Sequence, residues 1–156
     1  MTDNRYLEPD WFTRNIFNRA VRRLTLMGVS ILGSRELRVK GRTSGQWRST
    51  PVNLLTIEGV QYLVAPRGVT QWVRNLRASG YAGELRVGRQ VQIFVAHELS
   101  DDVKAPILRA YLRRWKFEVG MFFEGVGPDA SDEELAAIAP GYPVFVIDNV
   151  TPKVPM

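Results

Sequence analysis

The chain has 156 residues, of which 45% are hydrophobic, and a formal net charge of +5. This length and apolar content predict one domain with a hydrophobic core. The sequence has no cysteine and one histidine, His97. These counts exclude disulfides, iron–sulfur ligation, thiolate nucleophiles and multi-histidine metal sites, and we expect no metal.

The first residues carry acids at Asp3, Glu8 and Asp10 and no apolar block followed by a small-residue cleavage site. We therefore expect no signal peptide and a cytoplasmic location. No apolar run approaches the length that spans a bilayer. The protein is expected to be soluble or peripheral to a membrane.

The positive charge is concentrated in the first half of the chain. Residues 1–80 hold 13 Lys and Arg against 5 Asp and Glu, whereas residues 81–156 hold 8 against 11. An anionic partner therefore belongs to the first half. No basic region, helix-turn-helix spacing or aromatic RNA-binding signature accompanies this charge, so we expect a small anionic ligand and no nucleic acid.

Residues 11–32 are predicted to form an amphipathic helix, because Phe17, Val21 and Leu24 recur at helical spacing between arginines. Such a basic helix can lie on the inner face of a membrane, or it can cover one end of the domain with its arginines in water. Vesicle co-sedimentation separates the two alternatives, since only the first predicts tighter binding to anionic than to neutral liposomes.

Strands are predicted near 35–40, 46–57 and 60–65 and are expected to form an antiparallel meander, in which Glu58-Gly59 makes the second turn. A helix over 70–79, with Thr70 as its N-cap and Gly80 just beyond its end, follows. Two more strands, near 83–87 and 90–98, are joined through Gly88-Arg89.

The last third is predicted to contain two helices and one strand. The first helix covers about 101–116, and the second begins at the capping box Ser131-x-x-Glu134 and ends near 139–141. Residues 143–147 are continuously apolar, which predicts a buried strand. Six strands without β-α-β alternation favour a mainly β (α+β) fold, a small antiparallel barrel with peripheral helices. We expect a single domain, with the N-terminal helix in 1–33 and the barrel in 34–150.

Two basic stretches, 40–52 and 65–77, bracket a hairpin and can therefore converge in space. The first is a Gly-bounded turn carrying Arg42, Thr43 and Ser44, followed by Arg48. Guanidinium, hydroxyl and backbone N–H donors suit a phosphate. The second stretch enters the helix that begins after Thr70, where free N–H groups add partial positive charge. An isolated basic turn is more often a solvated hairpin, but the second stretch favours an anion site.

These stretches, G-R-T-S-G-Q-x-R-S-T-P-V and A-P-R-G followed by Q-W-x-x-N-L-R, resemble the deazaflavin-dependent nitroreductase and quinone reductase family. The resemblance runs from about Leu37 to Glu98. It implies the split β-barrel of FMN-binding, flavin reductase-like proteins, and it implies coenzyme F420 as cofactor. The implied activity is hydride transfer from the reduced cofactor to a small electron-poor acceptor, such as a quinone, an enone or a nitro compound.

The resemblance also assigns cofactor-binding residues. It implies contacts with the anionic tail by Arg42, Thr43, Ser44, Gln46 and Arg48, and contacts along the ring by Thr50, Pro51, Val52, Ala65, Pro66, Arg67 and Gly68, with Trp72 and Asn75 supporting the pocket. Candidates for the acceptor pocket are Asn53, Tyr111, Trp115 and Phe122, although core packing is the simpler interpretation of Tyr111 and Trp115 at i, i+4.

The sequence contains no Ser-His-Asp arrangement and no G-x-S-x-G elbow. His97 alternates with Val91, Ile93 and Val95 and is interpreted as a strand-end histidine, so no catalytic side chain is assigned. A protein with so little acid–base equipment borrows its chemistry from a cofactor. Two alternatives are a protein of the same fold that binds FMN and a non-enzymatic lipid or pigment carrier. A monomer and a homodimer are both compatible with the sequence.

Overall fold

The computed structural model describes residues 34–123 and 125–152. The predicted helix over 11–32, and with it the membrane contact, lies outside the described residues. The strands are β1 (Ser34–Lys40), β2 (Trp47–Asn53), β3 (Leu55–Ile57), β4 (Val60–Val64), β5 (Ala82–Val87), β6 (Gln90–Glu98) and β7 (Val144–Pro152). The helices are α2 (Gln71–Ala78), α3 (Ala105–Val119) and α4 (Asp132–Ile138), with 3₁₀ turns η3 (Asp101–Val103), η4 (Gly120–Phe122) and η5 (Ala139–Gly141).

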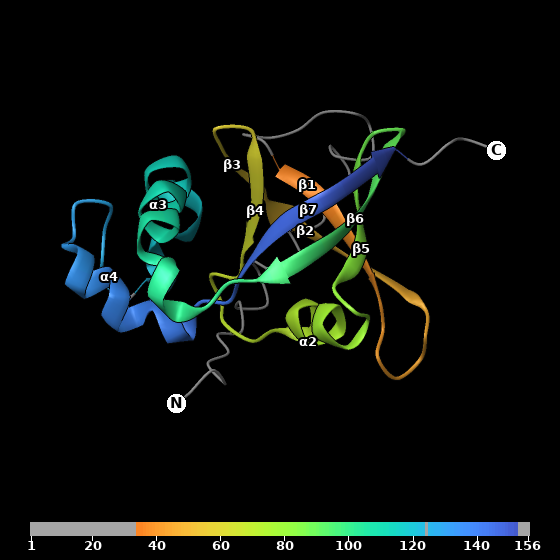
Figure 1. Cartoon of the computed structure of the whole chain (residues 1–156), viewed down its shortest axis with the longest axis horizontal. Coiled ribbons are helices and arrows are strands. Elements are labelled where there is room, and N and C mark those ends of the chain that lie inside the picture. Colours follow the sequence, from red (N-terminus) through yellow and green to blue (C-terminus); the bar gives the residue numbers. More distant parts are fainter. Residues whose placement is uncertain (1–33, 124, 153–156) are drawn as a thin grey trace.

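The strands form one antiparallel sheet in the order β2-β1-β5-β6-β7-β4-β3. Leu54 alone separates β2 from β3, although these strands occupy opposite ends of that order. A single residue can join the two edges only if the sheet curls until they approach each other. The sheet is therefore a curled half-barrel, visible in Figure 1 with α2 across one end.

Residues 34–123 and 125–152 contain seven strands, so the expected count of six is wrong. The predicted strand over 46–57 breaks at Leu54, because Leu54 is buried in one core and Leu55 in another. The expected meander is wrong for the same reason: β1 pairs with β2, and β3 pairs with β4, but the two hairpins lie at opposite edges of the sheet. The turn at Glu58-Gly59 is confirmed, with both residues at positive φ.

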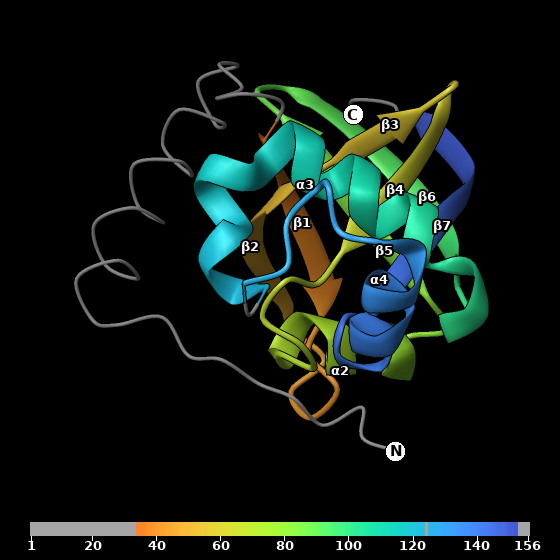
Figure 2. The same ribbon diagram turned by 90° about the vertical axis from the view of Figure 1, so that its left-hand side faces the viewer.

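Two hydrophobic clusters fill the fold. The first lies inside the curled sheet and is closed by α2, and it includes Leu37, Leu76 and Phe145. The second packs α3 and α4 against the outer side of β3, β4 and β7, the side that faces the viewer in Figure 2. Neighbouring residues of β7, Val144 and Phe145, belong to different clusters. The predicted buried strand is confirmed, because both of its faces are covered.

The helix starts follow from local chemistry. The predicted helix over 101–116 is divided: a 3₁₀ turn comes first, and α3 begins at Ala105. Pro106 fits only the first turn of a helix, because it has no N–H to donate. The capping box is confirmed, since the Ser131 hydroxyl accepts from the Glu134 N–H and the Glu134 carboxylate accepts from the Ser131 N–H.

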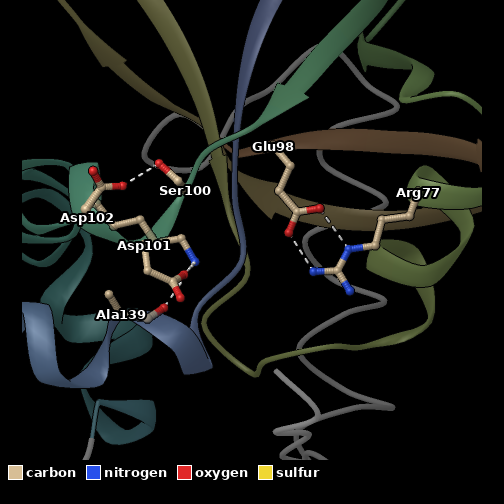
Figure 3. A network of polar contacts seen from close by, with 7 residues as sticks. Arg77, Glu98, Ser100, Asp101, Asp102 and Ala139 are labelled. Atoms are coloured by element: carbon tan, nitrogen blue, oxygen red, sulfur yellow. Dashed lines mark hydrogen bonds and ion pairs between the residues drawn. The ribbon is translucent and has the colours of Figure 1, made fainter. Parts of the chain in front are cut away.

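Polar contacts fix α2 and the α4–β7 connection at the end of β6 (Figure 3). The Arg77 guanidinium of α2 donates from Nε and Nη2 to the Glu98 carboxylate, at 2.9 and 2.6 Å. Beside it, the buried Lys104 ammonium donates to Asp101 at 2.7 Å and to the Ala139 carbonyl at 3.1 Å. Two parallel hydrogen bonds between a guanidinium and a carboxylate fix both the distance and the relative orientation of the two groups. The Arg77–Glu98 pair therefore fixes the position of α2 against the end of β6.

No helix within residues 34–123 and 125–152 combines the length and the apolar character needed to cross a membrane.

Candidate functional site: a basic cleft between the first hairpin and α2

A cleft of about 610 Å³ opens between the β1–β2 hairpin and the start of α2. It is lined by Val39, Gly41, Arg42, Thr43, Ser44, Arg48, Ser49, Thr50, Arg67, Thr70, Gln71, Trp72 and Asn75. Both basic stretches of the sequence therefore contribute to one cavity. Its volume is that of a site for a cofactor or another small molecule.

The hairpin turn is held in shape by its own backbone. The Gly41 N–H donates to the Gln46 carbonyl at 2.7 Å, and the Gly45 N–H donates back to the Gly41 carbonyl at 2.9 Å. Gly45 has a φ of +73°, which glycine adopts without steric cost. A Cβ on Gly41 would lie 2.9 Å from the Ser44 hydroxyl oxygen. The turn is thus compact, and it presents Arg42, Thr43 and Ser44 to the cleft.

Asn75 ties this turn to α2. Its side-chain oxygen accepts from the Arg42 backbone N–H at 3.1 Å and from Arg42 Nη1 at 2.8 Å. Asn75 is buried, with 6% of its surface exposed, so the acceptor oxygen of these bonds is largely shielded from water, although Arg42 itself is exposed. The resemblance assigned Asn75 to support of the pocket; in the structure it positions Arg42 across a separation of 33 residues.

The cleft is electropositive. Its lining includes Arg42, Arg48 and Arg67 and no Asp or Glu. Among the described residues, the exposed Arg48 guanidinium has no hydrogen-bond or ion-pair partner. Its charge is available to a ligand, and guanidinium groups bind phosphate and carboxylate in a bidentate manner. Outside the cleft, burial lowers the pKa of Arg35, and arginine stays protonated at neutral pH.

An aromatic side chain forms part of the wall. Trp72 is half-buried and packs on Phe145 of the first cluster, with ring centroids 5.8 Å apart and planes inclined at 56°. A tilted pair of this kind is a favourable aromatic arrangement. One face of the site is therefore anchored in the core of the barrel.

The start of α2 also contributes. Thr70 occupies the N-cap position with extended backbone angles, but its side chain makes no capping hydrogen bond. Only 6% of Thr70 is exposed, and within the described part of the chain its hydroxyl has no hydrogen-bond partner. Thr70, Gln71, Val39, Gly41 and Ser49 were not among the predicted site residues. For Val39 the available signal was the alternation of β1, which places Val39 on the same face as the buried Leu37.

The predicted cofactor residues divide between the cleft and its surroundings. Those that line the cleft are Arg42, Thr43, Ser44, Arg48, Thr50, Arg67, Trp72 and Asn75. Those that do not are Gln46, Pro51, Val52, Ala65, Pro66 and Gly68. Val52 and Ala65 are buried in the first cluster, inside the curled sheet. Contacts between any of these residues and a cofactor stay predictions.

The predicted acceptor-pocket residues lie outside this cleft. Tyr111 and Trp115 are each 1% exposed in the second cluster, and Phe122 packs against it. Asn53 is half-buried at the end of β2. The His97 side chain is 73% exposed, and its Nδ1 lies 3.0 Å from Asp148 Oδ2. In residues 34–123 and 125–152, no group of three or more His, Asp or Glu side chains is arranged to hold a metal ion.

A curled antiparallel half-barrel with a short helix across one end is the architecture of a split-barrel protein, and the arginines of its cleft suit an anionic ligand. The model of the F420H(2)-dependent quinone reductase family matches residues 10–118. The chain belongs to this family. Membership of this family identifies the protein as an F420H₂-dependent reductase. A comparison with curated proteins gave no match.

Solved structures agree on the fold. A chain described as a domain-swapped dimer is 18% identical, with a TM-score of 0.52 over 90% of this chain and 100% of that one. A NimC/NimA family protein from Clostridium acetobutylicum is 14% identical, with a TM-score of 0.50 over 88% of each chain. A protein of unknown function from Agrobacterium tumefaciens is 12% identical, with a TM-score of 0.54 over 98% of this chain and 61% of that one. These likenesses support the split-barrel fold, whereas the FMN-binding, flavin reductase-like fold stays a prediction.

Proposed function

We propose that the cleft between the β1–β2 hairpin and α2 binds coenzyme F420 and that the protein uses it to reduce a small, electron-poor acceptor of the quinone, enone or nitro class. The observation that carries the proposal is the composition of this cleft. Three arginines, several hydroxyl groups and no carboxylate line a volume of about 610 Å³. Family membership supplies the cofactor, and the cleft supplies a place that suits its charge.

The donors present fit an anionic cofactor. Arg48 has a guanidinium without a partner among the described residues, and the turn beside it carries Thr43 and Ser44. Arg42 is held by Asn75 through two hydrogen bonds. Because its guanidinium is fixed before a ligand arrives, less conformational entropy is lost on binding. The hairpin residues Arg42, Thr43, Ser44 and Arg48 would hold the anionic tail.

When bound, reduced coenzyme F420 supplies the hydride that reduces the acceptor. The residues of the chain orient the reactants and exclude water. Trp72 provides an apolar wall that the core supports through Phe145. No Asp, Glu, His or Tyr lines the cleft. The accompanying proton therefore comes from water or through a hydroxyl group such as that of Ser49 or Thr50.

Fluorescence binding to F420, FMN, FAD and NADPH tests the proposal directly. We expect F420 to bind and FMN to compete poorly, because the hairpin donors suit a long acidic tail. Reduced F420 with a quinone, an enone and a nitro compound then tests turnover and the acceptor class. Tighter binding of FMN than of F420, or binding of F420 without turnover of any acceptor, would contradict the proposed function.

Removing the histidine is expected to leave turnover nearly intact. His97 is exposed, pairs with Asp148 and does not line the cleft. In His97→Gln, kcat with reduced F420 should stay within about twofold of the wild-type value, because catalysis rests on positioning rather than on a titrating side chain. A large loss of kcat at unchanged F420 affinity and Tm would identify His97 as a proton-transfer residue and would refute this prediction.

A further inference from the structure

Tyr81 has a backbone conformation that its side chain does not favour. Its φ is +65°, and within residues 34–123 and 125–152 Glu58 is the only other residue besides glycine with a positive φ. At positive φ a side chain crowds its own backbone, which is unfavourable for a bulky residue such as tyrosine. Such a conformation persists only where the surrounding structure holds it. The contacts of Tyr81 therefore indicate what this conformation achieves.

The end of α2 does not require this conformation at Tyr81. The Tyr81 N–H donates to the Leu76 carbonyl at 2.9 Å, which is the bond that closes a helix in the Schellman motif. That motif needs one left-handed residue, and Gly80 supplies it with a φ of +70°. The Tyr81 carbonyl accepts from the Ala96 N–H at 2.9 Å. Glycine or asparagine at position 81 would make the same backbone bonds with less strain, so the reason for tyrosine lies in its ring.

The ring of Tyr81 packs on the residue that supports the cleft wall. Tyr81 is half-buried, and its ring centroid lies 6.1 Å from that of Phe145, with the planes inclined at 47°. Phe145 is fully buried, and its ring also packs on Trp72, which lines the cleft. Trp72 lies in the first turn of α2, whereas Tyr81 follows the last turn. Aromatic side chains therefore connect both ends of α2 to one buried ring.

We propose that Tyr81 is a positioning residue for the cleft: its left-handed backbone places its ring against Phe145, and Phe145 in turn keeps Trp72 in one orientation in the cleft wall. This inference deepens the proposed function and rests on it, because that function places the F420 cofactor beside Trp72. The physical reason is packing. A close-packed core leaves Phe145 little room to move, and removal of the Tyr81 ring would open space into which Phe145 can turn. Trp72 would then lose a fixed neighbour and sample more than one orientation.

The test compares Tyr81→Asn with Tyr81→Phe. Asparagine tolerates a positive φ and removes the ring, whereas phenylalanine keeps the ring and removes only the hydroxyl. In ¹⁵N NMR spectra of the ligand-free protein, the indole N–H signal of Trp72 should broaden or split in Tyr81→Asn and stay single in Tyr81→Phe. The Kd for F420 should rise about tenfold in Tyr81→Asn and stay within about twofold of the wild-type value in Tyr81→Phe. Glu58→Asn, at the other positive φ and outside the cleft, is the matched control and should change neither readout.

A double-mutant cycle separates this role from general destabilisation. If Tyr81 acts through Trp72, then Tyr81→Asn should change the F420 affinity by less than about twofold once Trp72 is already alanine. An undiminished loss in the Trp72→Ala background would show another route and overturn the inference, as would an unchanged Trp72 signal in Tyr81→Asn. All affinities are measured at a temperature at which each variant is folded. Tyr81→Leu, which keeps apolar volume without an aromatic ring, replaces Tyr81→Asn if asparagine prevents folding, and it should give the same pattern.

The Trp72 signal is measured without cofactor, which keeps the two proposals apart. A broadened Trp72 signal in Tyr81→Asn, together with a wild-type protein that does not bind F420, would refute the proposed function and leave the positioning of Trp72 by Tyr81 standing. Binding of F420 by the wild-type protein, with the Trp72 signal and the Kd both unchanged in Tyr81→Asn, would overturn the inference and leave the proposed function standing.

Discussion

Phe145→Ala is expected to lower the free energy of unfolding by about 3–5 kcal/mol. Phe145 is fully buried in the first cluster, and its ring packs on Trp72 at 5.8 Å and on Tyr81 at 6.1 Å. Alanine removes this contact area and leaves a cavity that the surrounding strands fill only in part. Urea unfolding measures the change, and the Tm should fall by roughly 6–20 °C.

The same substitution should also weaken cofactor binding, because Trp72 loses its support and no longer holds the cleft wall in place. Leu135→Ala is the matched control. Leu135 is fully buried in the second cluster, away from the cleft, so its substitution should cost about 2–5 kcal/mol and leave the F420 affinity of the folded protein unchanged. Both affinities are measured under conditions in which each variant is folded. An equal loss of F420 affinity in the two variants would show that the contact with Phe145 does not help Trp72 to hold the cleft wall in place.

Arg48→Ala is expected to weaken F420 binding by about 1.5–3 kcal/mol, which is about 10- to 150-fold in Kd. Arg48 lines the cleft, and within the described residues its guanidinium has no protein partner to lose. The fold should survive, since Arg48 is exposed. Fluorescence titration at low salt measures the change, and the difference between variant and wild type should shrink as salt screens the charge.

Arg113→Ala is the control for charge alone. Arg113 is exposed on α3 and lies outside the cleft, so its removal changes the net charge by the same amount at a distance from the site. Arg48→Lys should recover part of the affinity, because lysine keeps the charge but lacks the planar fork of arginine. If Arg48→Ala and Arg113→Ala bound F420 equally well, the hairpin would not hold the anionic tail.

Much of the fold was predictable, because hydrophobic periodicity and turn chemistry are local signals. The turns at Glu58-Gly59 and Gly88-Arg89, the capping box at Ser131 and the buried strand near 143–147 all follow from neighbouring residues. The break at Leu54 did not follow in this way. It contains no glycine or proline, and it arises because Leu54 and Leu55 enter different cores, a tertiary effect that overrides the local pattern.

The cleft was predictable in part. The residues of the basic turn face it as expected, because a compact Gly-bounded loop leaves its side chains outside the sheet. The bonds from Asn75 to Arg42 join residues 33 positions apart, and one sequence without homologues carries no sign of such a pairing. Thr70 read as an ordinary N-cap, because the missing capping bond depends on the orientation of its side chain.

The single-residue joint at Leu54 has a consequence for solubility. The edge of a sheet presents unpaired N–H and C=O groups that can recruit a strand from another molecule. Here the two edge strands are β2 and β3. Pro51 deprives β2 of one donor, and β3 is only three residues long. Because Leu54 tethers these edges to each other, neither offers a long straight template, and the barrel is protected against edge-to-edge aggregation.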